Sequence, residues 1–168
     1  MVMFLLKRIE LVNPDYLGYV RTIRHACRGL IFKDDKILLS YEEKKDVYMI
    51  PGGGVENNES LSDCCKREVF EETGVVCTPV VNYLEIEELF DTMRHINHYF
   101  ACEVIEETEQ RNLTQRELEV GLILVWIPIK EALNIFGKYE KFFNIDKAMF
   151  GLYRREFLAI RTWLNKEH

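Results

Sequence analysis

Apolar residues gather in short runs along much of the chain, and most of these runs stop at residues that favour turns. The runs predict strands near residues 1–13, 24–32, 36–40, 47–50, 75–89, 93–104 and 122–126. The first begins with the apolar stretch Met1–Leu6 and is expected to end near Asn13, where proline and aspartate follow. The second and third are expected to form a hairpin across Asp34-Asp35.

Three segments show helical rather than alternating spacing. Ser60 is a good N-cap with Asp63 three residues later, so a helix is expected from there to about Thr73, ending at Gly74. A short helix is expected to begin near Pro128. An amphipathic C-terminal helix is predicted by the apolar residues Met149, Leu152, Tyr153, Phe157, Ile160 and Leu164.

The order of these elements predicts an α/β or α+β fold in which helices cover a mixed sheet. The chain has 168 residues, of which 48% are hydrophobic, and this suits one domain spanning residues 1–168. The segment 106–114 is polar and is expected to be a loop.

Composition narrows the class of protein. The net charge of −6 lacks the basic footprint of a protein that binds a nucleic-acid duplex. The five cysteines form no CxxC pair, so we expect reduced thiols buried as small hydrophobic groups, rather than a disulfide framework or a zinc site. The run Met1–Leu6 is too short for a secretory signal, and no stretch is long enough to cross a bilayer. We therefore expect a cytoplasmic protein with no membrane partner.

Three glutamates in the predicted helix share one face. Glu68, Glu71 and Glu72 are three and four residues apart, so they lie one above another. Like charges on one stripe repel each other and weaken a helix, and a hard cation such as Mg²⁺ would offset that cost. The alternative is a solvated acidic face that Lys66 and Arg67 partly neutralise, and for an isolated E-x-x-E-E pattern this alternative is favoured.

The residues before the helix favour a cation-binding site over a solvated acidic face. Pro51 and the glycines Gly52, Gly53 and Gly54 are expected to end a strand and to lead through a loop to the helix, and glycines allow the backbone to approach a ligand closely. Glu59 lies just before the helix, where it favours the positive end of the helix dipole and could pair with Arg67.

The whole segment 53–75 resembles the Nudix box, G-x5-E-x7-R-E-U-x-E-E-x-G-U, in which U is a bulky aliphatic residue. All nine defined positions are filled, in one register, by Gly53, Glu59, Arg67, Glu68, Val69, Glu71, Glu72, Gly74 and Val75. So long a pattern is far more specific than a single short glycine motif. The chain is therefore identified as a member of the Nudix hydrolase family, similar to the MutT-like pyrophosphohydrolases.

The resemblance implies an α/β/α sandwich with the box as a loop-helix-loop over a mixed sheet. It also implies hydrolysis of a nucleoside diphosphate linked to another group, with Mg²⁺ as cofactor and Mn²⁺ as a substitute. By the same resemblance Glu68, Glu71, Glu72 and the carbonyl of Gly52 are metal ligands, and Glu59 and Arg67 form the pair that shapes the loop. The substrate candidates are a nucleoside triphosphate, an oxidised nucleotide, ADP-ribose and a nucleotide sugar, and similar proteins are commonly homodimers.

Residues outside the box supply further candidates. A general base is sought at Glu117 or Glu119, ahead of the strand at 122–126, although each could equally be an ordinary exposed loop residue. Arg24 and Arg28 share one face of their strand and, like Gly53 and Gly54, could contact substrate, a salt bridge being the default for the arginines. His95 and His98 should point to opposite faces of a strand, which argues against a shared metal.

Two other functions are weighed against hydrolysis. A Nudix-like module that binds a nucleotide without turning it over usually lacks some box carboxylates, and this chain keeps them all. An isomerase of isoprenoid diphosphates also uses the fold, but the chain lacks a dedicated cysteine and glutamate pattern for that reaction. The sequence thus favours hydrolysis and leaves the substrate open.

Overall fold

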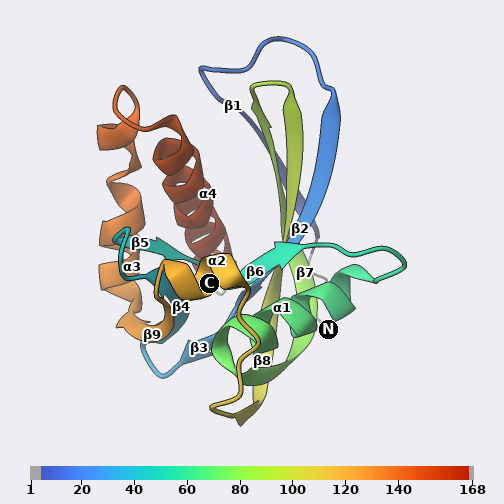
Figure 1. The fold of residues 1–168 in the computed structure, drawn as a ribbon, viewed down its shortest axis with the longest axis vertical. Helices are drawn as coiled ribbons and strands as arrows, with labels where there is room; N and C mark the ends of the chain where they lie inside the picture. Colours follow the sequence, from blue (N-terminus) through green and yellow to red (C-terminus); the bar gives the residue numbers. More distant parts are fainter. Residues whose placement is uncertain (1–4, 167–168) are drawn as a thin grey trace.

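Two β-sheets, with helices on both sides, make up the protein (Figure 1). The computed structural model describes residues 5–166. The prediction of an α/β/α arrangement with a mixed sheet is confirmed.

The larger sheet contains five strands in the order β1-β7-β8-β2-β6. These strands are β1 (Lys7–Val12), β7 (Val75–Phe90), β8 (Met93–Glu107), β2 (Thr22–Leu30) and β6 (Gly52–Gly54). The pairs β1–β7 and β8–β2 are parallel, and the pairs β7–β8 and β2–β6 are antiparallel. The long β7–β8 hairpin turns at Asp91, whose φ of 48° lies in the left-handed region that aspartate tolerates.

The smaller sheet is antiparallel and is built around β4. It contains β3 (Phe32–Lys33), β4 (Lys36–Glu42), β5 (Val47–Met49) and β9 (Leu122–Pro128). Strand β9 runs along the whole of β4, and β3 and β5 also pair with it.

The helices form the outer layers. Helix α1 (Leu61–Thr73) packs on β2 and β7 over a cluster that includes Cys27, Cys64, Cys65 and Val69. Helices α3 (Ile129–Gly137) and α4 (Lys147–Leu164), with the 3₁₀ turn η1 (Tyr139–Phe142), enclose the larger core on the other side. A short helix, α2 (Gln115–Glu119), precedes β9. None of the helices within residues 5–166 is long and apolar enough to span a membrane.

Most element predictions are confirmed, including the Ser60 cap, the end of α1 at Gly74 and the amphipathic α4. The expected first strand is present only from Lys7, and residues 1–4 of the predicted run lie outside the described part of the chain. All five cysteines are free thiols, four of them buried, as the composition predicted.

Three local predictions were wrong. The single strand expected at 24–32 is split, because the chain leaves the larger sheet at Ile31 and joins the smaller one. The glycines after Pro51 form strand β6 rather than a loop, because they pair with β2. This pairing needs glycine at position 52, since a Cβ there would collide with the Cys27 carbonyl of β2. The segment around Glu117 is helical, with a Thr114 capping box that sequence inspection could have found.

Candidate active site

The acidic face of α1 is held in place by a single guanidinium group. Arg67 Nε donates to Glu59 Oε1 at 2.6 Å, and Nη1 donates to Glu68 Oε1 at 2.7 Å and to Glu71 Oε2 at 3.1 Å. Its Nη2 donates to the Gly54 carbonyl at 3.1 Å. Arg67 therefore ties the strand before the helix to two of the three stripe carboxylates, while its hydrogen bond lowers the pKa of Glu59 to about 2.

Glu72, the third carboxylate of the stripe, lies in a different environment. Its side chain is 5% exposed, and its Oε2 accepts hydrogen bonds from Ser40 Oγ at 2.8 Å and from the Gly52 amide at 3.4 Å. Burial raises its pKa to about 8, and the negative charges of Glu117 and Glu68 act in the same direction, while Ser40 and Arg28 oppose the shift. Glu72 is thus a carboxyl group for which a nearby cation would favour ionisation.

Glu68 is crowded by its neighbours as well. Burial, together with the charges of Glu71 and Glu117, raises its pKa, and Arg67 opposes the shift. A Cβ at Gly53 would overlap the Glu68 carboxylate, so this position needs a glycine for the carboxylate to lie against the backbone of β6.

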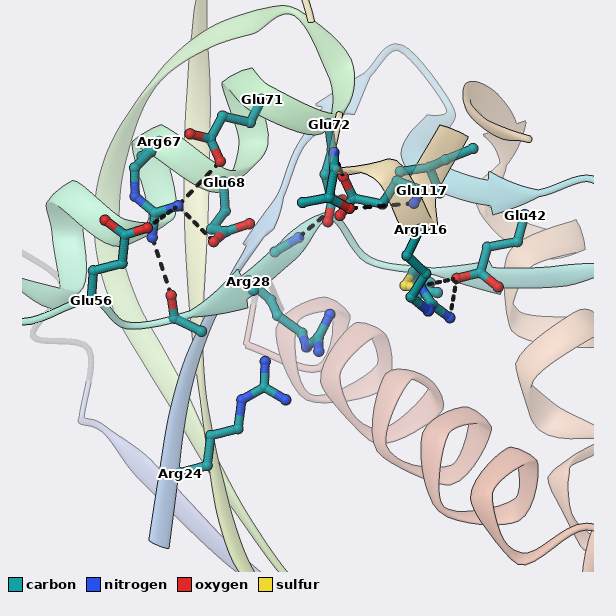
Figure 2. Close-up of a pocket in the computed structure, with 16 residues that line it drawn as sticks. Arg24, Arg28, Glu42, Glu56, Arg67, Glu68, Glu71, Glu72, Arg116 and Glu117 are labelled. Atoms are coloured by element: carbon teal, nitrogen blue, oxygen red, sulfur yellow. Dashed lines mark hydrogen bonds and ion pairs between the residues drawn. The ribbon is translucent and has the colours of Figure 1, made fainter. Parts of the chain in front are cut away.

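These groups form one wall of a cavity of about 440 Å³ (Figure 2). Strands β2 and β6, helix α1 and helix α2 contribute most of the lining. The charged lining residues are Glu42, Glu56, Glu68, Glu71, Glu72 and Glu117 on the acidic side and Arg24, Arg28, Arg67 and Arg116 on the basic side.

The arginines that share a face of β2 meet the carboxylates across this cavity. Arg28 is buried, and it donates from Nε to Asn97 Oδ1 at 3.0 Å and from Nη1 to the Ile50 carbonyl at 3.1 Å. Arg24 is exposed and lies near Gly54. Figure 2 shows its side chain pointing to the same side as that of Arg28. Both arginines therefore line the cavity, Arg28 as a fixed group and Arg24 as a more accessible one.

The structure separates the two candidate bases. Glu117 lines the cavity, and its Oε2 accepts from the Thr114 amide at 2.8 Å, which fixes it at the start of α2. Glu119 is exposed, lies outside the lining and accepts a hydrogen bond from Gln115 at 3.0 Å. Of these two candidates, only Glu117 lines the cavity together with the α1 carboxylates.

Sequence inspection missed one charged pair in the lining. Glu42 is 2% exposed, and Arg116 donates to its Oε1 from both Nη atoms at 3.1 Å. The two residues are 74 positions apart, so only the folded chain brings them together.

The histidines do not form a shared site. His98 is buried beside His25, with Nε2 to Nδ1 at 2.9 Å, and its other nitrogen lies 3.2 Å from Glu85. His95 points to a separate cavity that also contains Glu88 and Arg155. The prediction that His95 and His98 lie on opposite faces of their strand agrees with this arrangement.

The donor chemistry of the cavity fits a hard divalent cation. Carboxylate and carbonyl oxygens are the ligands that Mg²⁺ prefers, and the lining carries an excess of carboxylates whose mutual repulsion a cation would relieve. Within residues 5–166, no three acidic, histidine or cysteine side chains converge tightly enough to form a ready-made metal cluster. Arg67 instead occupies oxygens of Glu68 and Glu71, so a cation would compete with this guanidinium for them.

Comparisons with known proteins agree with this geometry. A model of the NUDIX domain matches residues 23–149. The chain is 27% identical over 121 residues to diphosphoinositol polyphosphate phosphohydrolase 3-alpha of Mus musculus, covering 72% of this chain and 71% of that protein. It is 24% identical over 135 residues to a probable DHNTP pyrophosphohydrolase of Lactococcus lactis subsp. cremoris, covering 80% of this chain and 77% of that protein.

Solved structures share the fold. A NUDIX hydrolase from Nitrosomonas europaea superposes with a TM-score of 0.65 at 22% identity, covering 86% of this chain and 90% of that one. The E. coli ORF135 protein superposes with a TM-score of 0.55 at 22% identity, covering 83% and 91% respectively.

Proposed function

Since this chain belongs to the Nudix hydrolase family and acts on diphosphate bonds, we propose that it uses Mg²⁺ to hydrolyse a nucleoside diphosphate linked to another group. The observation that carries the proposal is the shared cavity, in which the α1 carboxylates face Arg24 and Arg28. A cation held by the carboxylates and the two arginines would together neutralise a diphosphate, whose charge otherwise opposes attack by an anion.

The metal ligands in this proposal are Glu68, Glu71, Glu72 and the carbonyl of Gly52. Bound there, Mg²⁺ would neutralise phosphate oxygens and lower the pKa of a coordinated water. The buried Glu72 becomes an effective ligand only when it ionises, because burial holds its pKa at about 8 without a cation. Ser40 and the Gly52 amide fix the orientation of its carboxylate.

The remaining residues position the reactants. Arg28 is immobilised by Asn97 and Ile50, so it can bind a phosphate oxygen with little loss of side-chain entropy. In this proposal Glu117 accepts the proton of the attacking water, and the support for this role is the Thr114 cap, which fixes its carboxylate at the cavity wall. Arg67 and Glu59 hold the loop and α1 together, a structural role.

A substrate panel tests the proposal. Purified protein is incubated with nucleoside triphosphates, ADP-ribose, nucleotide sugars and a diphosphoinositol polyphosphate, with Mg²⁺ or with EDTA, and the products are identified by mass spectrometry. At least one nucleoside diphosphate derivative should be cleaved at its diphosphate only when Mg²⁺ is present. Cleavage of the diphosphoinositol compound alone would refute the nucleotide part of the proposal.

Matched glutamine variants test the residues. Glu71→Gln removes a proposed ligand, and losing several kcal/mol of transition-state stabilisation lowers the rate by on the order of 100-fold or more. Glu103→Gln makes the same chemical change at an exposed position on β8, and it should leave the rate unchanged. Equal rates in the two variants would refute the ligand assignment. If the unmodified protein binds nucleotides without hydrolysing them, the protein is a binding module instead.

A further inference from the structure

A second, smaller cavity lies between the larger sheet and the N-terminal half of α4. Its volume is about 200 Å³, and its polar lining includes Asn13, Asp15, Glu88, His95 and Arg155. The aromatic ring of Phe90 completes one side. In Figure 1, helix α4 lies to the left of the hairpin formed by β7 and β8.

Several polar groups around this cavity have unsatisfied hydrogen-bonding capacity. The atoms His95 Nε2, Arg155 Nη2 and Asp15 Oδ1 are buried and have no hydrogen-bond partner among the described residues. His95 is 8% exposed and Arg155 is 4% exposed. Because an unpaired buried polar group is costly, and all three side chains border the same space, the missing partners are expected to come from a molecule in that space.

Specific contacts maintain this cavity, so it is not a packing defect. Glu88 is fixed at its border by Arg155 Nη1 at 2.9 Å and by Asn97 Nδ2 at 3.3 Å, both donating to Oε1. Gly151 lies within helix α4 here, although glycine is unfavourable inside a helix. A Cβ at this position would lie 2.9 Å from Asn13 Nδ2 and 3.2 Å from Glu88 Oε2, so the glycine lets two polar groups reach the helix.

The charges of the lining restrict what could bind. Asp15 and Glu88 are balanced by Lys147 and Arg155, and burial, with the nearby arginines, lowers the pKa of His95 to about 2, so its ring is neutral. Two carboxylates disfavour a phosphate, and two cationic side chains disfavour a metal ion. A neutral molecule that both donates and accepts hydrogen bonds fits this lining, and a flat ring would pack against Phe90.

The cavity adjoins the proposed active site. His95 and Arg24 are partners in the parallel β8–β2 ladder, so their side chains leave the same face of the sheet. A hydrogen-bonded chain also joins the two sites, from Arg28 through Asn97 to Glu88. A molecule whose diphosphate lies beside Arg24 and Arg28 could therefore place another part of its structure near His95.

We propose that this cavity binds the nucleobase of the substrate and prefers a guanine-type ring, which has N–H donors and a carbonyl acceptor along one edge. Asp15 accepts from the exocyclic amino group, and Arg155 and His95 face the ring acceptors. The assignment rests on the proposed hydrolysis of a nucleoside diphosphate derivative and names the base that such a substrate carries.

Nucleoside monophosphates test the assignment without turnover. Guanosine, inosine and adenosine 5′-monophosphates are titrated calorimetrically into the protein in EDTA. Inosine monophosphate differs from the guanosine compound only in lacking the 2-amino group, so losing one hydrogen bond to a buried acceptor should weaken binding by about tenfold. Adenosine monophosphate should bind no more tightly than inosine monophosphate. Equal affinities, or no binding by any of the three, would overturn the assignment and leave ordered water as the occupant.

A pair of alanine variants locates the preference. Asp15→Ala should reduce the affinity for guanosine monophosphate to that for inosine monophosphate, whereas Asp35→Ala, an exposed change in the β3–β4 turn, should retain the difference. Thermal unfolding checks that both variants are folded. A retained preference in Asp15→Ala would overturn the assignment. Nucleotide hydrolysis without base preference refutes the cavity assignment alone, and base preference without any nucleotide hydrolysis refutes the proposed function alone.

Discussion

Replacing Glu72 by glutamine is expected to stabilise the metal-free protein while removing its activity. Glu72 is 5% exposed, and burial raises its pKa from 4.5 to about 8. Because the folded-state pKa is raised, this carboxyl group weakens the fold once the pH exceeds the unfolded value, and the penalty grows until the pH passes about 8. A glutamine never ionises, and its oxygen can accept the same hydrogen bonds from Ser40 and Gly52.

The size of the effect follows from the pKa shift. At about 1.36 kcal/mol per unit, a shift from 4.5 to about 8 corresponds to about 5 kcal/mol for the fully ionised group. Local relaxation and entry of water reduce the cost of a buried charge. We therefore expect Glu72→Gln to unfold with a free energy about 2–4 kcal/mol higher than the unmodified protein at pH 8, and within about 1 kcal/mol of it at pH 5.

Urea unfolding in EDTA at pH 5 and pH 8, followed by circular dichroism, measures the difference. Glu103→Gln, an exposed change of the same kind, is the matched control and should shift the stability by less than about 0.5 kcal/mol at either pH. Equal stability of Glu72→Gln and the unmodified protein at pH 8 would show that Glu72 ionises without cost, and the reasoning would fail.

Adding Mg²⁺ supplies the second half of the test. A cation that binds only the folded state raises its stability, by about 2.7 kcal/mol at a hundredfold excess over its dissociation constant. The unmodified protein at pH 8 should gain stability with Mg²⁺, whereas Glu72→Gln should gain much less and should hydrolyse no substrate. An equal gain in both proteins would place the cation away from Glu72.

Three further predictions concern other groups. Glu117→Gln should slow hydrolysis by about 100-fold or more, whereas Glu119→Gln should leave the rate within about twofold, and equal near-normal rates would remove Glu117 as the base. Glu156→Gln should lower the free energy of unfolding by about 3–5 kcal/mol in urea titrations. The reason is that this buried carboxylate accepts hydrogen bonds from the Arg155 guanidinium, the Tyr99 hydroxyl and the Ile50 amide. A loss under about 1 kcal/mol would contradict this account. Burial lowers the pKa of His95, so its neutral ring contributes stability that is fully present above about pH 6.5 and is lost as the pH falls. Between pH 6.5 and pH 5, the free energy of unfolding of the unmodified protein should therefore fall by about 2 kcal/mol more than that of His95→Gln. Parallel pH profiles of the two proteins would refute this.

The parts of the site that the sequence predicted are those encoded by local spacing. Glu68, Glu71 and Glu72 share a face because three and four residues complete a helical turn, and Ser60 and Gly74 mark the ends of the helix that carries them. The same spacing could not show that Glu72 is buried and Glu71 only half-buried, because the burial of Glu72 depends on Ser40 from another strand. The stripe was therefore predictable, and the burial that raises the pKa of Glu72 was not.

Long-range pairs account for most of what the sequence did not show. Arg155 and Glu156 lie in a helix that was predicted from its apolar positions, and a charged residue in such a pattern is usually assigned to the solvent face. In the structure both are buried, and Glu156 accepts hydrogen bonds from Ile50 and Tyr99. Buried charges of this kind are stable only with partners that the fold supplies from distant segments, which one sequence cannot pair.

The two cavities draw on different parts of the chain. The groups proposed to act on the diphosphate come mainly from one continuous segment, from Gly52 to Glu72, and their geometry is set by one helix and the strand before it. The smaller cavity draws on Asp15, His95 and Arg155, which are separated by most of the chain. Substitutions around that cavity can alter which molecule fits without moving α1, because none of the residues that line it belongs to α1 or β6. Exchange of Asp15 should therefore change base selectivity and leave the response of Glu72 to Mg²⁺ intact, and this independence can be measured with the same unfolding assay.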